Sequence, residues 1–140
     1  MMNRTLPPAS WSISSQADVV TARRYGLRVA LQLGFPEAEA TKIAVVISEL
    51  ARNIILYAQR GFISLTPVED ATGTYIRIIA EDKGPGIQDL DRVLAGGYTT
   101  SKGLGLGVSG SKKLMDEFEI ETAVGAGTKV IAVKWLRKKH

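Results

Sequence analysis

The spacing of apolar side chains predicts two helices in the first half of the chain. Ser15 and Asp18 stand at capping-box spacing ahead of an apolar stripe, so we expect a helix to begin there and to end at Gly34. Pro36 suits the first position of a second, longer helix that should end near Gly61. The side chains of this second helix that we expect in the core are Ile43, Val46, Ile47, Leu50, Ile54 and Ala58.

Alternating apolar positions and β-branched residues predict strands in most of the remaining chain. The expected strands are a short edge strand at residues 10–15, then 62–66, 74–82, 119–124 and 128–136, with a third helix at 108–118. Polar residues 69–73 and the glycines at 125 and 127 would form the turns. The pattern predicts an α+β fold: a two-layer sandwich in which a mixed, mostly antiparallel sheet of four to five strands is covered on one face by three helices.

Composition restricts the chemistry that this fold can carry. With 140 residues, 45% of them hydrophobic, the chain is expected to form one domain over residues 1–140. It has no cysteine, which excludes disulfides, thiolate catalysis and thiolate-bound metals. Its single histidine, His140, argues against a site built from imidazoles. Any bound metal would therefore be held by oxygen ligands.

The net charge of +4 does not come from a basic arm. Residues 1–70 contain seven Lys and Arg against six Asp and Glu, and residues 71–140 contain eleven against eight. The short basic run at residues 137–139 is interpreted as a solvated tail. No segment reads as a signal peptide or a membrane span. We therefore expect a cytoplasmic protein without a nucleic-acid or membrane partner.

A carboxylate and an amide share one face of the second predicted helix. Glu49 and Asn53 lie four residues apart and project together with Lys42 and Tyr57. A solvated polar stripe is the simpler interpretation of such a face. A nucleotide site offers another, because Mg²⁺ needs an oxygen ligand and the terminal phosphate needs a carboxylate near it. Asn53 suits the first role and Glu49 the second.

Glycine-rich motifs follow the predicted strands. Asp82 ends a strand just before Gly84-Pro85-Gly86, where a carboxylate could accept from the exocyclic amine of adenine, although such a motif alone is usually a turn. The ladder Gly103-x-Gly105-x-Gly107 leads into a helix and offers backbone N–H groups to phosphates. The chain has neither a P-loop motif nor the strand context of a dinucleotide fold.

Four motifs together carry a family resemblance. They are, in order, Glu49…Asn53, Asp82-x-Gly84-x-Gly86, Gly103-x-Gly105-x-Gly107 and Gly127-Thr128, and they resemble the boxes of the GHKL ATPases, which include gyrase, Hsp90, histidine kinases and MutL. The resemblance covers about residues 45–130. Within this superfamily, the strings at residues 48–54, 110–118 and 134–135 are similar to the T-type switch serine/threonine kinases of bacterial stressosomes, which are related to anti-sigma factor kinases.

The resemblance implies a Bergerat fold that binds ATP with Mg²⁺ and phosphorylates serine or threonine on STAS-domain proteins. It implies a partner switch in a stress-response complex, in which the released kinase activates a downstream regulator such as a PP2C-type phosphatase. By motif position, Glu49 would be the general base, Asn53 the Mg²⁺ ligand and Asp82 the reader of adenine. The other nucleotide-binding positions would be Gly84 and Gly86 in the base pocket, Ser101, Lys102, Gly103, Gly105 and Gly107 at the phosphates, and Thr128 beside the adenine.

One position separates the related classes. Tyr57 stands where anti-sigma kinases often carry a histidine, which favours the T type. Two alternatives remain open: an anti-sigma factor kinase that sequesters an RNA polymerase sigma factor, and a non-catalytic GHKL interaction module. The presence of both Glu49 and Asn53 argues against the non-catalytic module, because binding alone needs no base.

Overall fold

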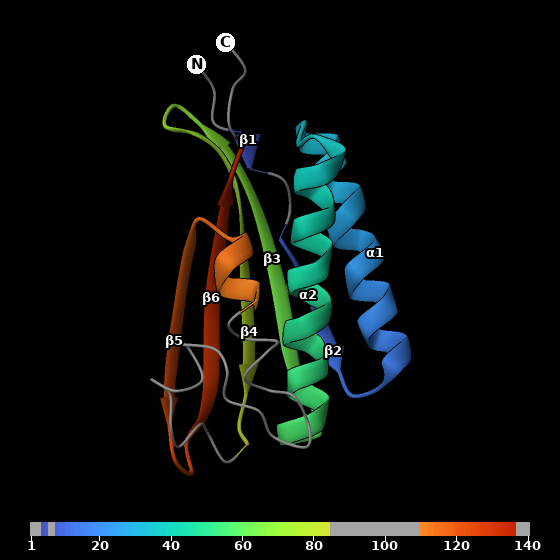
Figure 1. Ribbon diagram of the computed structural model, residues 1–140, viewed down its shortest axis with the longest axis vertical. Coiled ribbons are helices and arrows are strands. Elements are labelled where there is room, and N and C mark those ends of the chain that lie inside the picture. The colour runs from blue at the N-terminus through green and yellow to red at the C-terminus, as the bar shows by residue number, and fades with distance from the viewer. Residues whose placement is uncertain (1–3, 6–7, 85–109, 137–140) are drawn as a thin grey trace.

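The computed structural model describes residues 4–5, 8–84 and 110–136. Two long helices lie side by side on one face of a single sheet (Figure 1). They are α1 (Gln16–Leu33) and α2 (Glu37–Ala58). Gly26 allows them to approach closely, because a Cβ atom there would lie 2.2 Å from Cδ1 of Ile47.

The ends of α1 confirm the helix signals in the sequence. The Ser15 side chain accepts a hydrogen bond from the Asp18 backbone N–H at 3.3 Å, and the Asp18 carboxylate accepts from the Ser15 N–H at 3.1 Å. Gly34 ends the helix in the left-handed conformation, with φ 104°. In α2, Pro36 is the N-cap residue rather than the first helical residue, and the helix ends at Ala58.

Six strands form the described sheet. They are β1 (Arg4–Thr5), β2 (Ala9–Ile13), β3 (Gly61–Asp70), β4 (Gly73–Asp82), β5 (Glu117–Ala123) and β6 (Gly127–Trp135). The order is β1-β3-β4-β6-β5, with β2 also paired to β3, and all of these pairings are antiparallel. The α+β class and the mostly antiparallel sheet are confirmed, and the small strand β1 is an addition to the expected set.

Strand β3 is longer than predicted. The sequence suggested an end at Thr66, before a proline, but the strand continues through Pro67 to Asp70. Ala9 of β2 pairs with Leu65, whereas Thr5 of β1 pairs with Val68. Pro67 therefore falls where the neighbour on that side of β3 changes, a position that tolerates a residue without a backbone N–H.

The third predicted helix is shorter than expected. Residues 110–114 are helical, but β5 already begins at Glu117, so the prediction of helix to residue 118 was wrong; residues 108–109 lie outside the described part. The physical reason is competition from β6. The Asp116 N–H donates to the Val133 carbonyl at 2.9 Å, and the Trp135 N–H donates to the Asp116 carboxylate at 2.7 Å.

Alternation along β4 carries one polar side chain to the helix side of the sheet. Ile76, Ile78 and Ala80 are buried beneath the helices, and Asp82 shares their face at the end of the strand. On the opposite face, Phe62 is 57% exposed. The helix-facing end of β4 is therefore where the apolar core gives way to a polar group.

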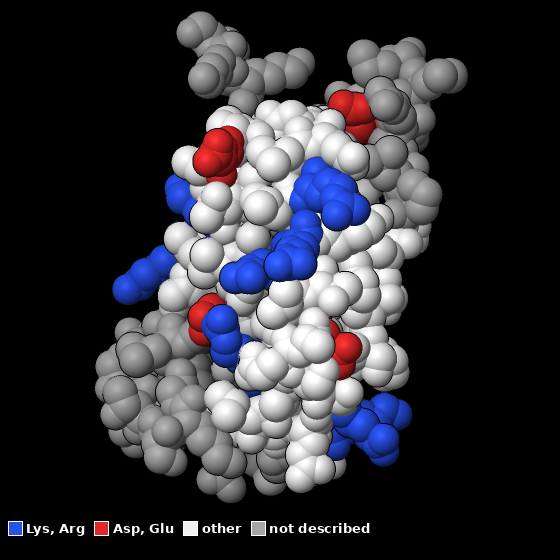
Figure 2. Space-filling view, turned by 90° about the vertical axis from the view of Figure 1, so that its right-hand side faces the viewer, with Lys and Arg blue, Asp and Glu red and all other residues white. Residues whose placement is uncertain are grey.

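Positive side chains gather over the middle of the face shown in Figure 2. The exposed arginines of α1 are Arg23, Arg24 and Arg28. Positive side chains therefore lie on the surface of α1, and Arg60, Lys83 and Lys129 lie around the strand ends near Asp82 as well. Among the described residues, neither α1 nor α2 is apolar over a stretch long enough to cross a bilayer.

Candidate active site

The predicted site residues that the structure describes lie on α2 and at the ends of two strands, β4 and β6. Glu49 and Asn53 project from α2, and Asp82, Gly84 and Thr128 lie at the lower ends of β4 and β6 in Figure 1. The helix carries the predicted base and metal ligand, whereas the strand ends carry the predicted adenine contacts. The remaining predicted positions lie outside the described residues: Gly86, Ser101, Lys102, Gly103, Gly105 and Gly107.

The α2 face is polar and only partly exposed. Oε1 of Glu49 lies 2.7 Å from Nη1 of Arg52, one turn along the helix, and the Glu49 side chain is 36% exposed. Sequence reasoning missed this ion pair, although the spacing of three residues was a signal for it. The Arg52 guanidinium therefore occupies one acceptor site of Oε1.

Asn53 differs from Glu49 in having no such neighbour. It is half-buried, and its amide has no hydrogen-bond partner within residues 4–5, 8–84 and 110–136. This unused oxygen fits a ligand for Mg²⁺, which needs only one or two protein oxygens when phosphates and water supply the rest. The described residues contain no cluster of three or more acidic or histidine side chains that could hold a metal by themselves.

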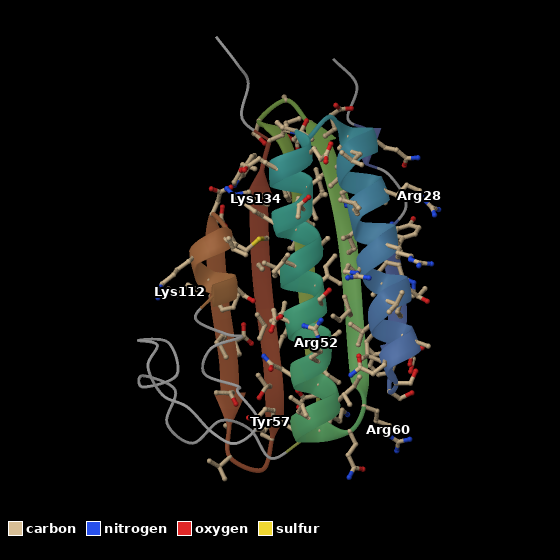
Figure 3. All side chains as sticks on the ribbon, turned by 45° about the vertical axis from the view of Figure 1, so that its right-hand side comes forward. Arg28, Arg52, Tyr57, Arg60, Lys112 and Lys134 are labelled. Carbon is tan, nitrogen blue, oxygen red and sulfur yellow. The ribbon has the colours of Figure 1, made fainter. Side chains whose placement is uncertain are left out.

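Tyr57 completes this side of α2. Figure 3 shows it at the lower end of the helix, on the side toward β6, below the labelled Arg52. It is half-buried and already has an interaction partner. The aromatic side chain therefore forms part of the wall between α2 and the strand ends.

Asp82 is held in a fixed orientation by the backbone that follows it. Its Oδ1 accepts a hydrogen bond from the Gly84 N–H at 2.8 Å, which forms an Asx turn. A Cβ atom at Gly84 would lie 2.7 Å from Cβ of Ala58, so glycine lets this turn pack against the end of α2. Within the described residues, Oδ2 is left to accept from a ligand.

Strand register places a row of oxygen-bearing side chains beside Asp82. Thr128 of β6 lies opposite Asp82, and Thr122 of β5 lies opposite Thr128, so all three share the helix-facing side. The two threonine hydroxyls are 3.0 Å apart, and the Thr122 hydroxyl also donates to the Gly127 carbonyl at 3.2 Å. Sequence reasoning missed Thr122, although pairing residues outward from the turn at Gly125 would have placed it opposite Thr128.

Glycine brings the backbones around Asp82 close together. Gly127 has φ 91°, and a Cβ atom there would lie 2.2 Å from the Asp82 carbonyl oxygen. At Gly61, a Cβ atom would lie 2.3 Å from the Glu81 carbonyl oxygen. The conformation of Gly127 fits the hairpin turn predicted there, and its small size also allows β6 to approach the end of β4.

A hollow of about 1020 Å³ opens at the strand ends. Its lining includes Asp82, Thr122 and Thr128, and it also reaches Phe62 on the open face of the sheet. Glu49 and Asn53 do not line it. The structure thus brings the predicted adenine contacts together, while the α2 pair forms a separate part of the site.

Comparison with known proteins covers both the helix and the strand ends described above. The family model of the histidine kinase-like ATPase domain matches residues 13–134. The serine/threonine-protein kinase RsbT of Bacillus subtilis (strain 168) is 48% identical over 125 residues, which cover 89% of this chain and 94% of the relative. The anti-sigma F factor of Priestia megaterium is 31% identical over 70% of this chain and 71% of its own length.

A third relative shows how far the similarity extends. The anti-sigma F factor of Thermoanaerobacter sp. (strain X514) is 29% identical over 89% of this chain and 90% of its own length. The match over residues 13–134 therefore includes α2, β4 and β6, the three elements that carry the described part of the candidate site. The chain belongs to the family of histidine kinase-like ATPase domains.

Proposed function

We propose that this chain is an ATP- and Mg²⁺-dependent serine/threonine protein kinase that phosphorylates STAS-domain proteins and acts as a partner switch in a stressosome. The kinase assignment rests on one observation, the 48% identity to RsbT over 89% of the chain. This similarity identifies the chain as an RsbT-like serine/threonine kinase. After release from its substrate complex, the kinase would activate a downstream regulator such as a PP2C-type phosphatase.

ATP is the nucleotide that the family implies. In the proposed complex, Oδ2 of Asp82 accepts a hydrogen bond from the adenine amine, because Oδ1 is already taken by Gly84. Thr128 contacts the same end of the nucleotide through its hydroxyl. A hydrogen bond between the Thr122 and Thr128 hydroxyls, which are 3.0 Å apart, holds this group in place. A carboxylate that is fixed before the ligand arrives loses little conformational entropy on binding.

Phosphate binding is assigned to the glycine ladder and to Asn53. The backbone N–H groups of Gly103, Gly105 and Gly107 would receive the phosphates, with Ser101 and Lys102 as further contacts, as in the family pattern. The Asn53 amide oxygen would hold Mg²⁺, which, when bound, neutralises charge on the phosphates. The half-buried position of Asn53, whose amide has no hydrogen-bond partner among the described residues, supports this role.

Glu49 is proposed as the general base. The substrate hydroxyl oxygen forms a bond to the γ-phosphorus while the bond from that phosphorus to the β,γ-bridging oxygen breaks, so ADP leaves and the hydroxyl proton passes to Glu49. The products are ADP and a phosphoserine or phosphothreonine. Arg52, which lies 2.7 Å from Oε1, leaves Oε2 as the oxygen that receives the proton.

The chief alternative is an anti-sigma factor kinase that sequesters a sigma factor, which the similarity to anti-sigma F factors supports. A non-catalytic module is the weaker alternative. Incubation with γ-labelled ATP, Mg²⁺ and a STAS-domain protein tests the proposal: labelled phosphoserine or phosphothreonine in that protein is the expected product. Retention of a sigma factor without transfer to a STAS protein would favour the anti-sigma alternative. If neither transfer nor sigma-factor retention is observed, the non-catalytic module is favoured.

A further inference from the structure

Lys134 is a buried cation outside the proposed chemistry. It lies near the end of β6 and shares the helix-facing side with Val130 and Ala132. Its side chain is only 9% exposed. Lysine is almost never buried this deeply unless its ammonium group is paired, so its partners identify what the residue holds together.

The Lys134 ammonium joins three elements. Its Nζ atom donates to the Leu114 carbonyl at 3.0 Å and lies 3.1 Å from Oε1 of Glu39. Leu114 ends the helical segment 110–114, and Glu39 stands in the first turn of α2. Figure 3 shows Lys134 at the upper part of β6, between that segment and the start of α2. The cation therefore links β6 to both helices.

Neighbouring contacts fix the same junction to the sheet. The Asp116 N–H donates to the Val133 carbonyl, and the Trp135 N–H donates to the Asp116 carboxylate. These bonds connect the end of the helical segment to β6. Lys134 extends the connection to α2, because Glu39 belongs to that helix.

The two helices that Lys134 connects lead to different parts of the proposed site. Gly107, the last residue of the glycine ladder, lies three positions before Gly110 at the start of the helical segment. α2 carries Glu49 and Asn53. We infer that Lys134 is a positioning residue, which sets the helical segment 110–114 against α2 and thereby aligns the triphosphate with the base and the metal ligand. This inference rests on the proposed function.

The adenine end should be independent of this link. Thr128 and Lys134 are six residues apart on one strand, a separation of about 20 Å along β6. Asp82, Thr122 and Thr128 are held by contacts of their own. Loss of the link should therefore change how phosphates bind and react but not how adenosine binds.

The test compares the two lysines that contact the Glu39 carboxylate. Lys134→Met removes the buried ammonium, and Lys42→Met is the matched control, because Lys42 contacts Oε2 of Glu39 at 2.8 Å but is 42% exposed. Calorimetry would measure affinity for adenosine and for a non-hydrolysable ATP analogue with Mg²⁺, and a labelled-ATP assay would measure kcat at saturating ATP. For Lys134→Met we expect about tenfold or greater losses in analogue affinity and in kcat, with adenosine affinity within about twofold of wild type.

Two further variants keep the test decisive. Lys134→Arg should recover part of both losses. If Lys134→Met does not fold, Glu39→Gln takes its place and should lower the affinity for the ATP analogue but not the affinity for adenosine. Equal losses for adenosine and the analogue, or no loss for either, would overturn the inference while leaving the kinase assignment intact. A wild-type protein without affinity for the ATP analogue would overturn both.

Discussion

At the residue scale, Glu49, the proposed general base, is the position where catalysis and binding should separate. Replacing it with glutamine keeps the shape of the side chain but removes the proton acceptor. Glu49→Gln should therefore reduce transfer to a STAS-domain protein by about 10²-fold or more while ATP still binds. A labelled-ATP assay with calorimetry measures both quantities. Transfer near the wild-type rate would remove Glu49 from the role of base.

Arg52 provides a comparison at the same site. It lies 2.7 Å from Glu49 but has no assigned part in proton transfer. Arg52→Gln removes the charge, so the Glu49 carboxylate loses an ion-pair partner and gains freedom. We expect this variant to retain transfer, in contrast to Glu49→Gln, because both oxygens of the base remain present.

Asp82 should contribute to affinity rather than to the rate of transfer. Asp82→Asn replaces a charged acceptor with a neutral one, which should weaken ATP binding by about 1.5–3 kcal/mol. Thr122→Val is the companion change, because it leaves Asp82 intact and removes only the hydroxyl that lies 3.0 Å from Thr128. Calorimetry should show a smaller loss for Thr122→Val. Unchanged affinity in Asp82→Asn would exclude this carboxylate from the site.

At the scale of elements, the turn between β5 and β6 offers a matched pair of glycines. Gly125 and Gly127 both have positive φ, at 82° and 91°. A Cβ atom at Gly125 would meet nothing within 4 Å, whereas one at Gly127 would lie 2.2 Å from the Asp82 carbonyl oxygen. Alanine at either position would be strained because the backbone has a positive φ there. Only Gly127→Ala would also push β6 away from β4, because its Cβ atom would clash with the Asp82 carbonyl.

The two alanine variants should therefore differ in stability and in binding. Gly125→Ala should lower the free energy of unfolding by about 1 kcal/mol, and Gly127→Ala should lower it further. Only Gly127→Ala should weaken adenosine binding, because it displaces the strand end that carries Thr128. Urea unfolding and calorimetry measure the two effects. Identical results for both variants would contradict the idea that close packing at Gly127 positions the site.

Local signals predicted the helix elements well because their causes are local. The capping box of Ser15 and Asp18 and the left-handed Gly34 set the ends of α1 within a few residues of sequence. The end of the helical segment 110–114 has a distant cause, since Asp116 bonds to residues of β6 almost twenty positions away. No local pattern contains that partner, so the predicted helix ran too far.

The site shows the same division between local and distant causes. The polar face of α2 with Glu49 and Asn53 follows from helical spacing, and the turn at Asp82 and Gly84 follows from composition. The row that joins Asp82, Thr128 and Thr122 depends on the register of three strands. The link through Lys134 depends on burial. The pairing of Thr122 with Thr128 lies within one hairpin, but the pairing of Asp82 with Thr128 and the burial of Lys134 involve segments far apart in the sequence, which no single short segment contains.

At the scale of the whole molecule, three carboxylates tie stability to pH. The Lys42 and Lys134 ammonium groups lower the pKa of Glu39, mainly through hydrogen bonds. The Ser14 backbone N–H, as the leading cause, lowers the pKa of Asp18, and the Thr72 hydroxyl lowers that of Asp70. Each group binds its proton less readily in the folded chain than in the unfolded chain.

The sign of the pH dependence follows from these directions. Because the folded pKa values lie below the unfolded ones, the contribution of these carboxylates is complete above the ordinary carboxyl range near pH 4 and is lost as pH falls through the folded values. Urea unfolding at pH 7, 5, 4 and 3 should show a free energy of unfolding that declines below about pH 5. Glu39→Gln should flatten part of this decline, because the glutamine side chain does not titrate. A decline as steep in Glu39→Gln as in the wild-type protein would show that the junction at Lys134 does not contribute to acid stability.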